Sequence, residues 1–210
     1  MRITIFGATG ETGRQLVQQA LAAGHEVVAY IRNPSKLNID HEHLKVIQGE
    51  LADETLIESA VSGADAVISA LGPRGGSKDK PITQGMQNII AAMKKQGVRR
   101  LIITSTLSAK DPNDPLNFKT KALVNLVKLT MHGAYEDIVS AAETVRNSDL
   151  DWTIVRLTML NNNPKSGKVK TGNVSAGEVG TWISRADVAD FMLKQVEHTE
   201  YLRQAPAISN

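Results

Sequence analysis

The sequence predicts a single α/β domain in three layers, with helices on both faces of a doubly wound parallel sheet. Short, continuous apolar runs alternate with amphipathic helical segments, a pattern typical of parallel strands that are buried on both faces. The chain has 210 residues, enough for one substantial core, and no linker or internal repeat divides it. Because βαβ crossovers are right-handed, few topologies other than the doubly wound sheet remain.

The predicted strands and helices alternate along the chain, except that the second and third strands follow each other without a helix between them. Strands are expected at 3–8, 25–32, 44–51, 64–72, 99–106 and 149–157, and helices at 14–24, 53–63, 82–98, 135–148 and 184–198. Gly24 and Gly97 are the expected helix ends, and Ser184 is the expected cap of the last helix.

Two segments interrupt this alternation, and both follow the carboxyl end of a predicted strand. The first is LGPRGGSKDKP, residues 71–81, and the second is an insertion at about 108–134 that includes an apolar helix. Open α/β sheets bind ligands at this edge, so we expect the insertion to lie on the substrate side.

Composition and charge exclude several classes of protein. The absence of cysteine excludes a disulfide scaffold, a thiolate nucleophile and a cysteine-built zinc site. The net charge is +2 with dispersed basic residues, which argues against a nucleic-acid surface. His41 and His43 form a weak pair in a polar loop, so no metal site is expected. Without a membrane-length apolar run or a signal peptide, we expect a cytoplasmic protein with no membrane partner.

The stretch GATGETG, residues 7–13, joins the first predicted strand to the first helix. In such a turn the first glycine permits the turn, the second lets phosphates approach the backbone, and the third lets the helix pack on the sheet. The helix N-terminus supplies N–H groups and partial positive charge to a pyrophosphate. The turn therefore predicts a dinucleotide site, with contacts from Gly7, Thr9, Gly10, Glu11, Thr12 and Gly13.

The G-x-x-G-x-x-G spacing differs from that of classical dehydrogenases and resembles the atypical short-chain dehydrogenase/reductase superfamily. The chain is similar to a group that contains NmrA-like proteins, bacterial NADH-flavin reductase-like proteins and the biliverdin reductase B (flavin reductase) branch. The resemblance covers essentially the whole chain, because YIRNPSK, GELAD, SALG, DLDWTIVR and SRADVAD all have counterparts there. It implies a Rossmann fold over 1–210 and a nicotinamide cofactor.

The end of the second predicted strand favours NADP(H) over NAD(H). An NAD site places Asp or Glu there to bind the ribose 2′-hydroxyl, whereas this chain has Arg32 and, one turn later, Lys36. A guanidinium suits a phosphate, and members that use NADP carry Arg or Lys at these positions. The alternative is a solvated charge at the strand end.

The resemblance implies further cofactor contacts at the ends of the later strands. Ser105 aligns with the active-site serine of the superfamily; alternatively, its hydroxyl closes a strand end. The expected contacts are Glu50 and Leu51 at the adenine, Leu71 and Gly72 at the nicotinamide ribose, and Thr104, Ser105, Thr158 and Met159 at the nicotinamide end.

The Tyr-x-x-x-Lys pair used by many members of the superfamily is absent. Tyr135 is present, but Val139 stands four residues later. A tyrosine without a lysine keeps a pKa near 10 and is a poor acid at neutral pH. We therefore weigh a catalytic Tyr135 against a packing or substrate contact.

Two functions are compatible with these features. The first is an NADPH-dependent oxidoreductase that transfers hydride to a flavin-like or quinone-like acceptor without the Tyr-Lys pair. The second is an NmrA-like redox sensor with little or no turnover that relays cofactor state to a protein partner. The lack of an extra partner-binding domain favours the enzyme. The histidine that the flavin reductase branch places after the sixth strand is replaced here by Leu157 to Leu160, which argues against biliverdin reduction specifically.

Overall fold

A computed structural model of the protein describes residues 1–72, 79–107, 109, 132–172 and 177–210. Most of the predicted insertion lies outside these ranges. The expected apolar helix at 122–133 lies outside them too, apart from its last two residues.

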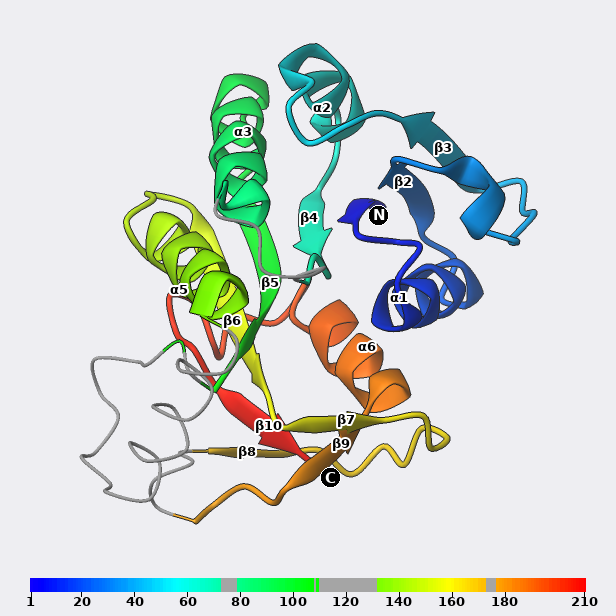
Figure 1. The fold of residues 1–210 in the computed structure, drawn as a ribbon. Helices are drawn as coiled ribbons and strands as arrows, with labels where there is room; N and C mark the ends of the chain where they lie inside the picture. The colour runs from blue at the N-terminus through cyan, green and yellow to red at the C-terminus, as the bar shows by residue number, and fades with distance from the viewer. Residues whose placement is uncertain (73–78, 108, 110–131, 173–176) are drawn as a thin grey trace.

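The described residues form an eight-stranded sheet of order β3-β2-β1-β4-β5-β6-β10-β8, shown in Figure 1. Every neighbouring pair is parallel except β10 and β8, which are antiparallel. The strands are β1 (Arg2–Phe6), β2 (Glu26–Ile31), β3 (Leu44–Gln48), β4 (Ala66–Ser69), β5 (Arg100–Thr106), β6 (Asp151–Leu157), β8 (Lys170–Gly172) and β10 (Ala207–Ser209). The first six strands have the doubly wound order, which confirms the predicted Rossmann class.

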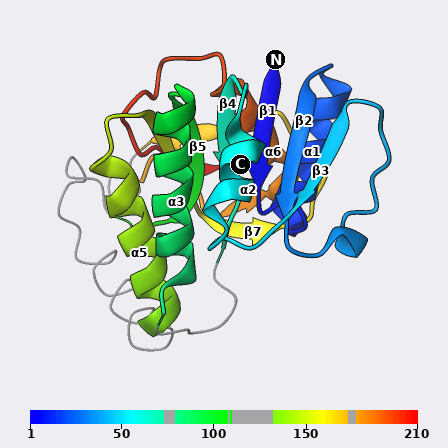
Figure 2. The same cartoon turned by 90° about the horizontal axis from the view of Figure 1, so that it is seen from above.

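Helices cover both faces of the sheet, as the two views in Figures 1 and 2 show. Alternate residues of the central strands face opposite sides: Leu101 packs into one core cluster and Ile102 into the other. One face carries α2 (Glu54–Val61), α3 (Pro81–Gln96) and α5 (His132–Arg146); the other carries α1 (Glu11–Ala22) and α6 (Arg185–Lys194). Within the described residues, no helix is long and apolar enough to cross a bilayer.

The C-terminal part of the chain contains four short strands that the sequence did not predict. Besides β8 and β10, strands β7 (Met159–Asn161) and β9 (Trp182–Ser184) pair in parallel as a separate two-stranded sheet. Each of the four has three residues, too few to produce a readable alternation of apolar and polar positions. The antiparallel pair of the described sheet, β8 with β10, lies at this edge and leaves the predicted doubly wound class unchanged.

Candidate cofactor-binding site

A cavity of about 870 Å³ opens at the carboxyl ends of β1, β2, β4, β5 and β6. This volume lies within the range of cofactor and small-molecule sites. Many of the residues predicted from the sequence come together in its wall. They are Gly7, Thr9, Gly10, Glu11, Thr12, Arg32, Glu50, Leu51, Leu71, Gly72, Thr104, Ser105 and Thr158.

The three glycines of the turn have different structural reasons to be glycine. Gly7 has a φ of +79°, and a Cβ there would lie 2.8 Å from the main chain of Ala70 at the end of β4. A Cβ on Gly13 would overlap the carbonyl oxygen of Gly7 and lie 2.8 Å from Cα of Ala8. A Cβ on Gly10 would approach only the Gly7 oxygen, at 3.3 Å. Gly7 and Gly13 thus allow the backbone to pack, whereas Gly10 borders the cavity.

The N-terminus of α1 is open toward this cavity. Its N-cap residue is Gly10, which offers no side-chain acceptor to the first N–H groups of the helix. Two other helices have a side-chain cap: Asp53 caps α2 and Ser184 caps α6, each accepting a hydrogen bond from a main-chain N–H. Uncapped N–H groups at a helix start form a site for an anion such as a pyrophosphate.

Tyr30, which was not selected from the sequence, lies on the side of the cavity where the adenine contacts are predicted. Its side chain is buried, and its hydroxyl donates to the carbonyl oxygen of Glu50 at 2.7 Å. Burial, followed by the nearby carboxylates of Asp53 and Glu50, raises the pKa of Tyr30 to about 12, so it remains a hydrogen-bond donor. A Cβ at Gly49 would collide with this hydroxyl. Tyr30 therefore fixes the loop that carries the predicted adenine contacts.

Ser105 provides an unsatisfied polar group at the other end of the cavity. The residue is 5% exposed, and its Oγ has no hydrogen-bond partner among the described residues. A buried hydroxyl without a partner is costly, so such groups in native proteins indicate a ligand or water that satisfies them. The open helix start and the Ser105 hydroxyl both fit a bound dinucleotide.

One wall of the cavity is closed by Asp137 of α5, a residue that is 3% exposed. Its carboxylate accepts hydrogen bonds from the N–H groups of Ile82 at 3.0 Å and Thr83 at 2.8 Å, and from the Thr83 hydroxyl. Nearby, Lys80 donates to the Ser140 hydroxyl at 3.1 Å. These contacts fix the start of α3 against α5.

Four of the predicted site residues do not line the cavity that the described residues form. Gly13 is packed beneath the turn, Lys36 ends the short 3-10 helix Pro34–Lys36, and Met159 is 56% exposed. Tyr135 lies on α5 but is also absent from the lining. Predicted contacts of these residues with cofactor or acceptor stay predictions.

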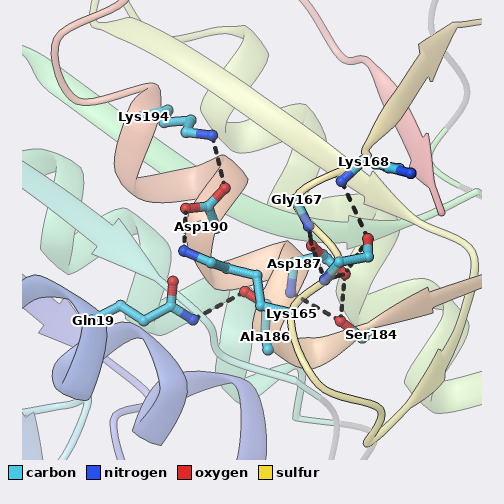
Figure 3. A network of polar contacts seen from close by, with 10 residues as sticks. Gln19, Lys165, Gly167, Lys168, Ser184, Ala186, Asp187, Asp190 and Lys194 are labelled. Atoms are coloured by element: carbon cyan, nitrogen blue, oxygen red, sulfur yellow. Dashed lines mark hydrogen bonds and ion pairs between the residues drawn. The ribbon is translucent and has the colours of Figure 1, made fainter.

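A polar network anchors α6 beside the cavity (Figure 3). The buried carboxylate of Asp187 accepts hydrogen bonds from the N–H groups of Ser166 and Gly167, the Ser184 hydroxyl and the Asn210 side chain. Burial opposes ionisation, but these hydrogen bonds outweigh it and hold the pKa of Asp187 below its usual value. The network joins the loop at Ser166 to α6.

Three further contacts in Figure 3 involve α6. Asp190 pairs with Lys165 at 3.1 Å and with Lys194 at 2.8 Å. The Gln19 side chain of α1 donates to the carbonyl oxygen of Ala186 at 3.0 Å. Residues at the start of α6 are thereby held in a defined position relative to α1.

A family model described as NAD(P)H-binding matches residues 7–199. The chain belongs to this NAD(P)H-binding family. Its resemblance to the atypical short-chain dehydrogenase/reductase superfamily is thus confirmed.

Two relatives match most of the length of this NAD(P)H-binding protein. The UPF0659 protein YMR090W of Saccharomyces cerevisiae is 27% identical over 209 residues, covering 94% of this chain and 88% of the relative. The chain spans 62% of a second relative, the chloroplastic protein At2g34460 of Arabidopsis thaliana, at 28% identity over 80% of this chain.

Two solved structures show the same fold over the whole chain. A short-chain dehydrogenase/reductase from Veillonella parvula in complex with NADP has a TM-score of 0.78 at 24% identity and is covered to 94%. ChuY of Escherichia coli O157:H7, described as an anaerobilin reductase, has a TM-score of 0.78 at 22% identity and is covered to 97%. Both matches cover 100% of this chain.

Sequence reasoning missed several cavity residues of this NAD(P)H-binding protein, and three of them hold the site through polar contacts. Tyr30, Asp137 and Arg185 all line the cavity. Tyr30 directly precedes Ile31 and Arg32, so its position near the end of β2 was a usable signal. Asp137 contacts α3 and Arg185 contacts α1, and no local sequence motif predicts such contacts.

Proposed function

We propose that this protein is an NADPH-dependent oxidoreductase that transfers hydride to a flavin-like or quinone-like acceptor. The observation that carries the proposal is the pairing, in one cavity, of an open helix start at Gly10 with the unpartnered Ser105 hydroxyl. Gly10 follows β1 and Ser105 lies near the carboxyl end of β5, with β4 between the two strands. The open helix start suits the pyrophosphate, and the Ser105 hydroxyl suits the polar nicotinamide end of the same molecule.

The preference for NADPH rests on Arg32. It follows β2 directly, lies exposed and lines the cavity. Where an NAD site has a carboxylate, this chain offers a planar guanidinium that pairs with a 2′-phosphate.

Bound NADPH would supply the hydride, while the protein supplies position and hydrogen bonds. Ser105 holds the nicotinamide end, and the wall near Asp137 and Ile138 bounds the acceptor side. Val139 occupies the place of the missing lysine, and Tyr135 does not line the described cavity. The proton that accompanies the hydride therefore comes from solvent, which suits conjugated acceptors whose reduced form takes up a proton readily.

The test is NADPH oxidation by the purified protein with FMN, FAD, riboflavin, a soluble quinone and biliverdin offered separately. The tetrapyrrole is included because the neighbour ChuY is described as an anaerobilin reductase. Steady turnover with one of these acceptors supports the proposal, and Ser105→Ala is expected to lower it. A matched control is Ser148→Ala, because Ser148 lies beyond the C-terminal end of α5 and does not line the cavity.

The absent Tyr-Lys pair also favours a second candidate, a sensor that binds NADPH without turnover and responds to it through a protein partner. Tight NADPH binding with no oxidation by any of the five acceptors would select this candidate. Absence of NADPH binding would reject both.

A further inference from the structure

Arg185 and Glu11 form an ion pair at the edge of the cavity. Arg185 begins α6 and Glu11 begins α1, and Nε of Arg185 lies 2.9 Å from Oε2 of Glu11. Both residues line the cavity. The Arg185 side chain is 23% exposed, and its Nη1 also donates to Oδ1 of Asn162 at 2.7 Å. Two acceptors thus hold the guanidinium in place.

Glu11 stands where a carboxylate hinders the binding of a pyrophosphate. It is the acidic residue of the first turn of α1, and the positive end of the helix dipole attracts any nearby anion, including this side chain. A free Glu11 carboxylate would compete with the pyrophosphate for the open N–H groups and repel its negative charge. The residue is 60% exposed on its side chain, so it has room to swing toward the helix start.

We propose that Arg185 is a cofactor-positioning residue that acts through Glu11. Its guanidinium neutralises the Glu11 carboxylate and draws it toward α6, away from the start of α1. The N–H groups beyond Gly10 then remain open for the pyrophosphate of the dinucleotide. This role depends on NAD(P)H binding, which the family shares, and does not depend on the acceptor or on turnover.

The contacts next to Arg185 explain why its guanidinium can hold the Glu11 carboxylate away from the start of α1. Ala186, next to Arg185, accepts a hydrogen bond from Gln19 of α1, and Asp187 is held by the network in Figure 3. Because the start of α6 is fixed relative to α1, the fold sets the separation of the two main-chain positions that carry Arg185 and Glu11.

The test is a double-mutant cycle read out as the dissociation constants of NADPH and NADH, measured by titration calorimetry at low salt. Arg185→Gln is expected to weaken the binding of both dinucleotides about tenfold, which corresponds to about 1.4 kcal/mol. The loss should be equal for the two, since both carry the pyrophosphate. Glu11→Gln alone is the reference variant of the cycle, because it removes the carboxylate through which Arg185 is proposed to act. Arg185→Lys, which keeps the charge, should retain most of the affinity.

The deciding comparison is Glu11→Gln against the double variant Glu11→Gln/Arg185→Gln. If Arg185 acts through Glu11, the two bind NADPH with the same affinity, within about twofold. A double variant that binds tenfold more weakly than Glu11→Gln would overturn the proposal, because Arg185 would then act directly or through the fold. Unchanged affinity in Arg185→Gln alone would also overturn it. The deciding comparison holds even if Arg185→Gln alone does not fold.

This outcome is separable from the proposed function. A cycle that behaves as expected in a protein without turnover supports the role of Arg185 and rejects the oxidoreductase. Turnover without coupling between Glu11 and Arg185 supports the oxidoreductase and rejects the role of Arg185.

Discussion

The starts of α1 and α3 border the same cavity and are built in opposite ways. At α3, the N–H groups of Ile82 and Thr83 are both taken by the Asp137 carboxylate. At α1, the N-cap residue Gly10 offers no side-chain acceptor. Both helices follow neighbouring strands, β1 and β4, at the same edge of the sheet. A helix start that belongs to the cavity wall is thus closed by a carboxylate, whereas the one at which we expect the pyrophosphate has no side-chain cap.

The largest expected effect separates two glycines within the open turn. Gly13→Ala should destabilise the protein by about 3 kcal/mol or more, because its Cβ would overlap the main chain of Gly7 and Ala8. Gly10→Ala should cost about 1 kcal/mol or less, because it meets one atom at 3.3 Å. Its methyl group nevertheless borders the cavity, so dinucleotide affinity should fall at least about tenfold. Urea unfolding and NADPH titration of both variants measure the two effects.

A Gly10 variant that stays folded and binds NADPH normally would contradict the assignment of the turn to the pyrophosphate. A Gly13 variant of unchanged stability would contradict the packing argument.

The closed helix start can be opened by Asp137→Ala. Removing the carboxylate leaves the N–H groups of Ile82 and Thr83 without their acceptor, and we expect a loss of about 2–3 kcal/mol in the free energy of unfolding. The affinity for NADPH should change little, because α1 is untouched. Asp137→Asn, which keeps one acceptor oxygen, should lose about half as much. If Asp137→Ala instead abolished NADPH binding at full stability, the residue would belong to the cofactor site.

The next effect concerns the choice of cofactor. Arg32→Ala should weaken NADPH binding about tenfold to a hundredfold, the value of one good charge-assisted contact of about 1.5–3 kcal/mol. NADH binding should hardly change, because NADH has no 2′-phosphate. Since the contact is exposed, the difference should shrink as salt is added. An equal fall in the affinities for NADPH and NADH would favour the alternative that Arg32 is a solvated charge at the strand end.

The smallest expected effect is that of Tyr135→Phe. Tyr135 does not line the cavity among the described residues, and no lysine supports it as an acid. Turnover with any acceptor that the wild type reduces should therefore change less than about twofold. A fall of about 100-fold or more, the scale of general acid catalysis, would show that Tyr135 donates the proton.

The features that the sequence predicts best are those that depend on residues close together in the chain. The alternation of apolar runs predicts the first six strands, and the GATGETG turn predicts the edge at which the cavity opens. Both signals come from residues close together in the chain. Strands such as β8 and β10 leave no such signal, because three residues show no period and their pairing joins distant segments.

The same distinction holds inside the cavity. Gly10 and Ser105 can be selected from strand ends and spacing. Asp137 cannot, because its role appears only when α3 and α5 pack together, 54 residues apart at Thr83. The Glu11–Arg185 pair joins the first and last helices of the described fold and is invisible in either segment alone.

The position of β10 has a consequence for how the protein is made. This strand lies between β6 and β8 and pairs with both, yet its residues are 207–209. During synthesis, the strands from β1 to β6 can pair as they leave the ribosome, whereas β8 has no partner in this sheet until residue 209 has emerged. This edge of the sheet therefore stays unfinished in the nascent chain until β10 has been made.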